Sequence, residues 1–440
     1  MAHPTNGTLF VRDSRTKQEY EIPIVDNAVL AVDFKNIRGY SDGSKMRGLL
    51  LYDPGLQNTA IKRSQISSSD ARGLPMIRGY SVEQLYSLQS DFEDLFHLMV
   101  LGKYPTPEEK EILRHTFAQE MINVPDTVVA AIKAFPPSST GMSMMLAGLS
   151  AYLASYDHAI PAKQGGNLYH NNPRLANKAA IKTTAAYAVV LGLTISHRKG
   201  IPFAPAQANK SFYENLFNMM GMADPITKLP NPLYIDVFRR AAILNADNGM
   251  THSTFLTLVA GSALPDPLSC LISATSAAYG PLHYGAQEAT WNNLIEIETK
   301  ENVPAFLEQV KRRERRLFGY GHRVHKTEDP RLAIIKGLLK ELNVSPATIP
   351  LMEIAYEIDR LAALDQYFTS RGLSANADFY FGFLIHAFGF DPDMITLANL
   401  AMRILGLMAH WREAMDQEIK LFRPLHIYTG PKQRITAARL

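Results

Sequence analysis

Residues 394–411 restrict the possible folds of this chain more than any other segment, because they are long, apolar and broken by few polar side chains. Asn399, Arg403, Gly406 and His410 follow one another at spacings of four, three and four, which places them on one side of a helix. An arginine in the middle of this helix would be costly in a lipid bilayer, so we predict a buried helix of a folded protein. A buried guanidinium needs an anionic partner, which is a carboxylate either of the protein or of a ligand.

The rest of the chain has the composition of an ordinary folded protein. Its 440 residues are 46% hydrophobic and 20% charged, enough for two or three domains, or for one large domain and a smaller one. The 45 basic and 42 acidic residues leave a formal net charge of +3, so neither a nucleic-acid partner nor a membrane partner is expected. The single cysteine, Cys270, excludes an intrachain disulfide, and the sequence has no HExxH-type motif, so no metal site is predicted.

The two ends of the sequence bear on localisation. Residues 1–7 show neither the apolar core of a signal peptide nor an Arg-rich amphipathic leader. The last three residues, Ala438-Arg439-Leu440, resemble a peroxisomal targeting tripeptide. We therefore expect a cytoplasmic or peroxisomal protein.

Local patterns predict a mostly α-helical protein with a small strand element near the N-terminus. Residues 8–24 alternate in places and indicate a hairpin. Ser90 or Asp91 can cap a helix that ends at Gly102, and residues 106–109 (Thr-Pro-Glu-Glu) join a capping box to a proline at the first helical position. Further helices are expected at residues 138–154, 177–193, 209–220, 236–247, 253–263, 269–279 and 286–300.

Two histidines flanked by glycines are candidates for catalysis. His283 lies in residues 280–285 (Gly-Pro-Leu-His-Tyr-Gly), where a turn between two apolar helical segments can direct an imidazole into a cleft. A histidine in a surface turn is the alternative. In residues 319–322 (Gly-Tyr-Gly-His), two glycines let the backbone approach a ligand closely and leave amide donors free. The alternative is a glycine-rich loop without a ligand.

A carboxylate and a basic segment complete the candidates. Asp378 precedes the largely aromatic residues 379–383, and a carboxylate against apolar groups has a raised pKa and becomes a better base towards a weak carbon acid. The alternative is an aspartate that caps a helix. Residues 311–316 (Lys-Arg-Arg-Glu-Arg-Arg) form either a solvated helix face or a contact for the phosphates of a nucleotide cofactor.

Together and in this order, these segments resemble the citrate synthase family. Residues 280–288 are similar to its first histidine motif, and residues 319–331 are similar to its most diagnostic motif. Residues 376–380 are similar to the motif of its catalytic aspartate. The segments that carry Arg403 and Arg423 are similar to its C-terminal arginine segments.

The resemblance extends from about residue 49 to residue 430 and implies a homodimer of mostly helical subunits, each with two domains. The large domain would comprise residues 1–292 together with residues 395–440, and residues 293–394 would form a small domain that closes over the active site. The site would take oxaloacetate and an acyl-CoA as co-substrate, with no permanently bound cofactor. Domain closure would exclude water around the reactive enol.

Carried over by position, the resemblance implies a role for each candidate residue. Asp378 would be the base that removes the α-proton of a thioester, and His283 would donate a hydrogen bond to the thioester oxygen. His322 would polarise and protonate the ketone of oxaloacetate. Planar guanidinium groups suit carboxylates, so arginines would hold the oxaloacetate carboxylates and fix the geometry of attack. These arginines are Arg331, Arg403 and, from the partner subunit, Arg423.

The resemblance also implies where CoA would bind. Its expected contacts run along the backbone of a short segment, with Arg315 or Arg316 near the phosphates. The residues of this segment are Leu317, Phe318, Gly319, Tyr320 and Gly321.

The sequence departs from the family at several positions of the expected pocket. Asn248 stands where the family usually has a second histidine that helps bind oxaloacetate, and Thr251 stands where it has an asparagine. Tyr284 and Gln287 replace the usual glycine and asparagine beside the first catalytic histidine. Asparagine offers a neutral amide donor and cannot be cationic, and His252, one helical turn away, is a candidate to replace the missing histidine.

Altered pocket positions beside a retained catalytic set suggest an acyl donor longer than acetyl-CoA. We therefore expect an acyltransferase that forms a 2-alkylcitrate from a longer acyl-CoA and oxaloacetate, by a Claisen-type condensation followed by thioester hydrolysis. An ordinary citrate or 2-methylcitrate synthase, which uses acetyl-CoA or propionyl-CoA, is the alternative. A third hypothesis, from another class, is an inactive homologue that binds CoA or a dicarboxylate.

Overall fold

The structure of this protein is a computed structural model, and its contacts form two compact units, Met1–Arg63 and Ser64–Leu440. The predicted site residue His322 and the C-terminal tripeptide lie outside the residues that the structure describes. The sequence did not predict a division at residue 63, and the domain boundaries expected at residues 292 and 394 stay predictions. The described residues are 5–40, 46–155, 168–321 and 329–430.

Short antiparallel strands are the main regular structure of the first unit. β1 (Gly7–Arg12) pairs with β2 (Glu19–Val25) in a register that sets Gly7 opposite Ile24. This pairing confirms the hairpin predicted for residues 8–24. The other elements of the unit are β3 (Ala28–Val29), the 3-10 helix η1 (Ala31–Asn36), β4 (Arg38–Tyr40) and β5 (Met46–Gly48).

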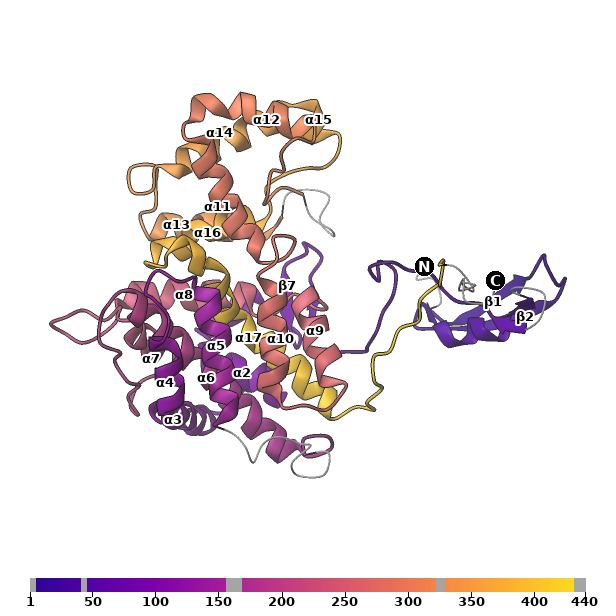
Figure 1. The fold of residues 1–440 in the computed structure, drawn as a ribbon, viewed down its shortest axis with the longest axis horizontal. Coiled ribbons are helices and arrows are strands. Elements are labelled where there is room, and N and C mark those ends of the chain that lie inside the picture. Colours follow the sequence, from indigo (N-terminus) through magenta and orange to yellow (C-terminus); the bar gives the residue numbers. More distant parts are fainter. Residues whose placement is uncertain (1–4, 41–45, 156–167, 322–328, 431–440) are drawn as a thin grey trace, which may run out of the picture. The chain divides into compact units, whose positions relative to one another are not determined.

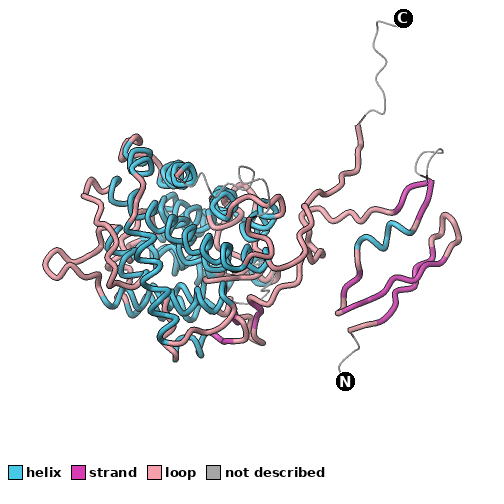
Figure 2. The backbone as a smooth tube through the Cα atoms, turned by 90° about the horizontal axis from the view of Figure 1, so that it is seen from below, coloured by secondary structure: helices cyan, strands magenta, loops and turns pink. Residues whose placement is uncertain are grey.

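Helices dominate the second unit, which confirms the mostly α-helical fold predicted from the sequence (Figures 1 and 2). Three short strands form one antiparallel sheet, β6 (Ser67–Ser69), β7 (Pro75–Ile77) and β8 (Tyr80–Ser81). The helices up to residue 261 are α1 (Val82–Ser87), α2 (Phe92–Phe96), the π-helix η2 (His97–Leu101), α3 (Pro107–Ile122), α4 (Asp126–Lys133), α5 (Gly141–Ala154), α6 (Pro173–Arg198), α7 (Phe212–Met219), α8 (Pro232–Asn245) and α9 (His252–Gly261). The later α-helices are α10 (Pro267–Ala278), α11 (Gly285–Ile297), α12 (Val303–Lys311), α13 (Arg331–Glu341), α14 (Leu351–Leu364), α15 (Gln366–Thr369), α16 (Ala377–Ala387) and α17 (Ile395–Met415).

Capping residues explain where the predicted helices begin. Asp91 caps α2 and Thr106 caps α3, each through a capping box in which the third helical residue bonds back to the cap. The first helical segment ends at Gly102, whose φ of 93° suits glycine. The other helices predicted between residues 138 and 300 are present with shifted ends. The largest shifts at a start are in α6, which begins at Pro173 instead of residue 177, and in α8, which begins at Pro232 instead of residue 236.

Several helices between residues 303 and 387 were not predicted from the sequence. Prolines lie at the start of three of them: Pro304 in the first turn of α12, Pro330 before α13 and Pro350 before α14. Proline lacks an N–H group, but the first turn of a helix has no internal acceptor for that group, so proline is tolerated there. The prolines at these three positions therefore mark helix starts.

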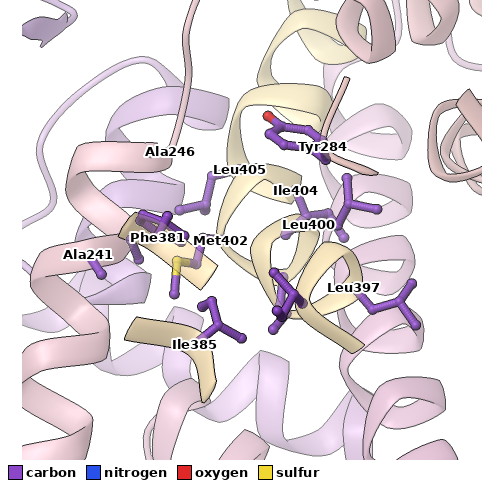
Figure 3. Packing of buried hydrophobic residues seen from close by; sticks show 14 of the residues in the cluster. Ala241, Ala246, Tyr284, Phe381, Ile385, Leu397, Leu400, Met402, Ile404 and Leu405 are labelled. Atoms are coloured by element: carbon purple, nitrogen blue, oxygen red, sulfur yellow. The ribbon is translucent and has the colours of Figure 1, made fainter. Parts of the chain in front are cut away.

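α17 is the central helix of the second unit (Figure 1). It carries the row of residues predicted to share one side of this helix, Asn399, Arg403, Gly406 and His410, which we call the polar stripe. It packs against α6, α8, α9 and α10, and its apolar side chains join a large buried cluster that includes Leu397, Leu400 and Ile404 (Figure 3). By length and apolarity, α6 and residues 392–415 could each cross a membrane. Both segments are mostly or wholly buried inside the protein, as core helices are.

α11 and α16 connect the core helix to the helices that follow α11 in sequence. α16 packs against α11, α13 and α17, and α11 also packs against α14 and α17. Since these helices meet next to α17, the turn before α11 and the first residues of α13 and α16 come close to the polar stripe. Two of the sequence-predicted catalytic residues lie here, His283 in the turn before α11 and Asp378 in the first turn of α16.

Candidate active site

A cavity of about 530 Å³ opens where the end of α8 and the starts of α9, α11, α13 and α16 meet α17. Apart from Arg423, every predicted site residue that the structure describes lines this cavity. A larger hollow of about 860 Å³ lies over α7 and α8, but none of the predicted site residues lines it. The predicted residues around the first cavity are Asn248, His283, Leu317, Phe318, Gly319, Tyr320, Gly321, Arg331, Asp378 and Arg403.

Arg423 is the described residue that the cavity does not include. It lies exposed in the extended segment after α17. The resemblance assigns it to the site of a partner subunit, so its role stays a prediction that a single chain does not test.

Asp378 has the environment of a general base. It lies in the first turn of α16, where the helix is capped by Asn376 and not by Asp378, so the alternative of a capping aspartate is wrong. Burial raises the pKa of its carboxyl, although a hydrogen bond from Gln287 and the positive charge of Arg331 partly oppose the shift. Gln287 Nε2 donates to Asp378 Oδ1 at 2.8 Å. A carboxylate with a raised pKa binds a proton more strongly, which suits the removal of a proton from carbon.

His283 is a neutral imidazole whose proton position follows from its hydrogen bonds. The backbone N–H of Ser253 donates to His283 Nε2 at 3.2 Å, and the Ser253 hydroxyl lies 2.9 Å from the same nitrogen. A backbone N–H can only donate, so Nε2 is the acceptor and the neutral ring carries its proton on Nδ1. Burial, together with the charges of Arg403 and His252, lowers the pKa of His283 to about 3. His283 is therefore a neutral donor through Nδ1, and not a cation.

Asp329 fixes the orientation of Arg331 and ties α13 to α16. Arg331 Nε and Nη2 donate to the two oxygens of Asp329 at 3.0 and 2.6 Å. The backbone N–H of Ala377, which precedes Asp378, donates to Asp329 Oδ2 at 3.0 Å. Burial opposes the charge on Asp329, but its bonds with Arg331 and with the Ala377 N–H outweigh that cost and hold its pKa at about 2. One buried carboxylate thus positions an expected substrate-binding arginine and the turn that carries the expected base.

The polar stripe of α17 faces the segment that joins α8 to α9. His410 Nε2 lies 3.1 Å from Asp247 Oδ2, and the N–H of Gly406 donates to the carbonyl of Ala246 at 3.1 Å. An added Cβ at Gly406 would lie 2.6 Å from that carbonyl oxygen, so glycine is required for the close approach.

Arg403, on the same stripe, has only part of its guanidinium bonded within the described part of the chain. Its Nη2 donates to Asn245 Oδ1 at 2.9 Å, and the side chain of Asn245 also bonds to that of Asn399. Arg403 Nε and Nη1 are buried and have no hydrogen-bond partner among the residues that the structure describes. Of the two partners that the sequence left open for this guanidinium, a ligand carboxylate fits better than a carboxylate of the protein.

The glycine segment expected to contact CoA is held against the start of α16. Gly319 and Gly321 have φ values of 72° and 79°, and a Cβ on Gly319 would lie 2.8 Å from the Cα of Phe379. The N–H of Gly321 donates to the carbonyl of Ser374, and the N–H of Phe318 donates to Asn293 Oδ1. The prediction that the glycine segment keeps its amides free is therefore wrong for Gly321.

Most of the basic segment at residues 311–316 forms ion pairs away from the cavity. Lys311 lies 2.7 Å from Asp365, and Arg315 lies 3.2 Å from Glu296. Arg316 lines the cavity, and its guanidinium carbon lies 5.3 Å from the ring centre of Phe318. The solvated interpretation thus describes most of the segment, whereas Arg316 lies in the wall of the cavity.

Four residues that hydrogen-bond to the candidate site residues were not recognised from the sequence. Ser253 bonds to His283, and Asp329 bonds to Arg331. Asn245 bonds to Arg403, and Gln287 bonds to Asp378. Gln287 was noticed because it replaces a usual asparagine, but nothing in the sequence indicated its bond to Asp378. Asn245 belongs to the altered segment 245–251, in which the family usually has a histidine at the position of Asn245, and this difference was the available signal for that residue.

Comparisons with known proteins agree with this geometry. The family model described as "Citrate synthase, C-terminal domain" matches residues 55–425. Alkylcitrate synthase phiJ of a fungal species is 57% identical over 99% of this chain and 96% of its own length, and alkylcitrate synthase tstJ of Talaromyces stipitatus is 53% identical over 97% and 95%. A solved ternary complex of citrate synthase from Thermoplasma acidophilum with carboxymethyl coenzyme A and oxaloacetate is 28% identical, with a TM-score of 0.77, over 88% of this chain and 98% of that chain. The chain belongs to the citrate synthase family, and it is an enzyme of the acyltransferase type.

Proposed function

We propose that this enzyme condenses an acyl-CoA with oxaloacetate and hydrolyses the thioester, which yields a 2-alkylcitrate and free CoA. The observation that carries the proposal is the composition of one cavity. A carboxyl with a raised pKa, Asp378, lies in the same wall as the neutral donor His283 and the guanidinium groups of Arg331 and Arg403. These are the groups needed to form an enol from a thioester and to hold a dicarboxylate beside it.

The first step would be enolisation of the acyl-CoA. Asp378 Oδ2 is the oxygen left for the substrate, because Oδ1 accepts the bond from Gln287. It would take the α-proton, while His283 donates from Nδ1 to the thioester oxygen as negative charge develops there. A neutral imidazole suits this role, because it stabilises the enol without placing a second cation beside Arg403.

The second step would form the carbon–carbon bond. Arg331 and Arg403 would bind the carboxylates of oxaloacetate and orient its ketone carbon towards the enol carbon. By resemblance, His322 would protonate the ketone oxygen as the bond forms, and Arg423 of a partner subunit in a homodimer would add a third guanidinium. Water would then cleave the carbon–sulfur bond, which releases the CoA thiol and a third carboxylate.

CoA would bind near residues 317–321, with the exposed guanidinium of Arg316 close enough to meet a phosphate. The backbone of this segment is fixed by bonds to Ser374 and Asn376, just before α16, and to Asn293, so it would offer a preformed surface. Weaker acyl-CoA binding by an Arg316→Ala variant, with oxaloacetate binding unchanged, would support this position.

A longer acyl donor is favoured over acetyl-CoA or propionyl-CoA by two observations. Relatives named alkylcitrate synthases are 57% and 53% identical over nearly the whole chain. The wall around His283 also differs from the usual family pattern at Tyr284 and Gln287, both of which are buried. An inactive binding homologue is disfavoured, because an inert protein would have no need to keep Asp378 buried with a raised pKa.

The test is a thiol-release assay with oxaloacetate and a series of acyl-CoA donors of increasing length, with each product identified by mass. We expect turnover to be fastest with a donor longer than propionyl-CoA. Asp378→Asn is the matched control, since it keeps the shape of the side chain and removes the base. Turnover with acetyl-CoA alone would refute the alkylcitrate assignment, and ligand binding without turnover for every donor would refute the enzyme assignment for these substrates.

A further inference from the structure

Tyr284 is a buried residue of the cavity wall to which the reaction described so far gives no role. It is the residue before α11 and is 6% exposed. Its ring centre lies 4.3 Å from that of His283, with 25° between the planes, and 5.4 Å from the guanidinium carbon of Arg403. Figure 3 shows the ring beside α17, near Ile404. The ring therefore adjoins both the expected thioester donor and an expected carboxylate-binding arginine.

The hydroxyl of Tyr284 has no hydrogen-bond partner among the described residues, although it is buried. The charges that act on it most strongly are those of Arg403, Asp378, Asp247 and Arg331. The hydroxyl is thus close to charged groups of the cavity wall, namely Arg403, Asp378 and Arg331, which we call the polar end of the cavity. A buried hydroxyl without a partner is unfavourable, and nearby arginines would attract a negatively charged oxygen to the same place.

The unpaired donors of Arg403 point to the same ligand chemistry. Arg403 Nε and Nη1 are buried without a partner among the described residues, next to the Tyr284 ring. Asn248 also lines the cavity and offers an amide where the family usually has a histidine. A small molecule rich in carboxylate and keto oxygens would satisfy all of these groups together, whereas an alkyl chain would satisfy none of them.

We propose that the Tyr284 hydroxyl donates a hydrogen bond to bound oxaloacetate and so replaces the histidine that the family carries at position 248. Two departures from the family pattern then form one compensating pair: a smaller side chain at Asn248 and a larger one at Tyr284. His252 is a weaker candidate for this role, because it is exposed at the start of α9. The inference rests on the proposed function in one respect, the identity of the 2-oxo dicarboxylate.

Tyr284→Phe tests the proposal, because it removes the hydroxyl and keeps the ring that packs on His283. Loss of one hydrogen bond to a charged group should weaken oxaloacetate binding about 10-fold to 100-fold, with the KM for acyl-CoA unchanged. Binding of oxaloacetate alone is measured by calorimetry, and KM values come from the thiol-release assay. Tyr279→Phe is the matched control, since Tyr279 is exposed and does not line the cavity.

A second variant asks whether the two positions compensate. Adding Asn248→His to Tyr284→Phe should recover part of the lost affinity, and the same change in the wild-type background should recover less. Unchanged oxaloacetate affinity in Tyr284→Phe would overturn the proposal, as would an effect confined to the acyl chain. If the wild type binds oxaloacetate but turns over no donor, the proposed function fails while the calorimetric comparison still decides the role of Tyr284.

Discussion

Gln287 tunes the expected base, and its replacement by methionine gives the sharpest test of the catalytic assignment. Methionine has a similar length and volume but no amide, so Gln287→Met removes the bond to Asp378 Oδ1 with little change in packing. It also removes Gln287 Oε1, a buried acceptor without a partner among the described residues. We therefore expect the variant to fold and to differ from the wild type mainly in the ionisation of Asp378.

The size of the effect follows from the difference between two hydrogen bonds. A bond to a charged group contributes about 1.5–3 kcal/mol, and a bond to a neutral group contributes about 0.5–1.5 kcal/mol. The difference of about 1–1.5 kcal/mol is the preference of Gln287 for the ionised form of Asp378, and it corresponds to about a tenfold change in the ionisation constant. Since the bond lowers the pKa of Asp378, its loss raises that pKa further.

The assay is the pH dependence of kcat/KM for acyl-CoA at saturating oxaloacetate. A base must be ionised to act, so activity rises with pH through its pKa, and the acid limb of the profile should move to higher pH in Gln287→Met. The plateau at high pH should be retained, because the carboxyl is ionised there in both proteins. Gln366→Met, at an exposed glutamine of α15 away from the cavity, should leave the profile unchanged. An unmoved acid limb, or an equal loss of activity at every pH, would show that Gln287 does not act through the ionisation of Asp378.

Four further variants address stability. Asp378→Asn should raise the melting temperature at neutral pH while it abolishes turnover. The raised pKa of Asp378 means that the folded protein binds the proton more tightly than the unfolded chain, so stability falls as pH rises through that pKa. A variant that melts at a lower temperature than the wild type at neutral pH would contradict this account. Asp329→Asn should lower the free energy of unfolding by at least about 2.5 kcal/mol at neutral pH. A carboxyl pKa of about 2 in the folded protein, against an ordinary value of 3.8, stabilises the fold above about pH 4, and this stabilisation is lost as pH falls towards 2. A denaturant titration at both pH values checks it, and a loss of stability that did not depend on pH would count against the reasoning. Gly406→Ala should destabilise by about 1–3 kcal/mol, because the new Cβ would meet the carbonyl of Ala246. Gly337→Ala, in α13 with nothing within 4 Å, should instead stabilise by about 0.5–1 kcal/mol, and thermal unfolding of the pair should show opposite signs.

Features that depend on local periodicity could be predicted from the sequence. The spacing of Asn399, Arg403, Gly406 and His410 predicted one buried stripe, and in the structure this stripe faces the segment around Asp247. The caps of α2 and α3 were predicted for the same reason, since a capping box involves residues only three apart. The helices α13 and α14 were not predicted, although a proline just before each of them is compatible with a helix start.

Contacts between distant segments could not be predicted in this way. Gln287 and Asp378 are 91 residues apart, and Asp329 reaches the backbone of Ala377 across 48 residues. Periodicity carries no information about such pairs, because they form only when α11, α13 and α16 pack together. The resemblance identified which residues line the cavity, but the groups that orient them, and the amide of Gly321 that is already bonded, required the structure.

The polar end of the cavity also has a consequence for the lifetime of the protein in a cell. Donors of Arg403 and Tyr284 are buried without partners among the described residues, and each such group disfavours the folded state by about 1–3 kcal/mol. A dicarboxylate that satisfied them would complete the core of the protein as well as serve as a reactant. At a concentration of about 100 times its Kd, a ligand adds about 2.7 kcal/mol of stability, enough to change how often the chain unfolds and meets a protease. The abundance of the enzyme would then follow the supply of its own substrate.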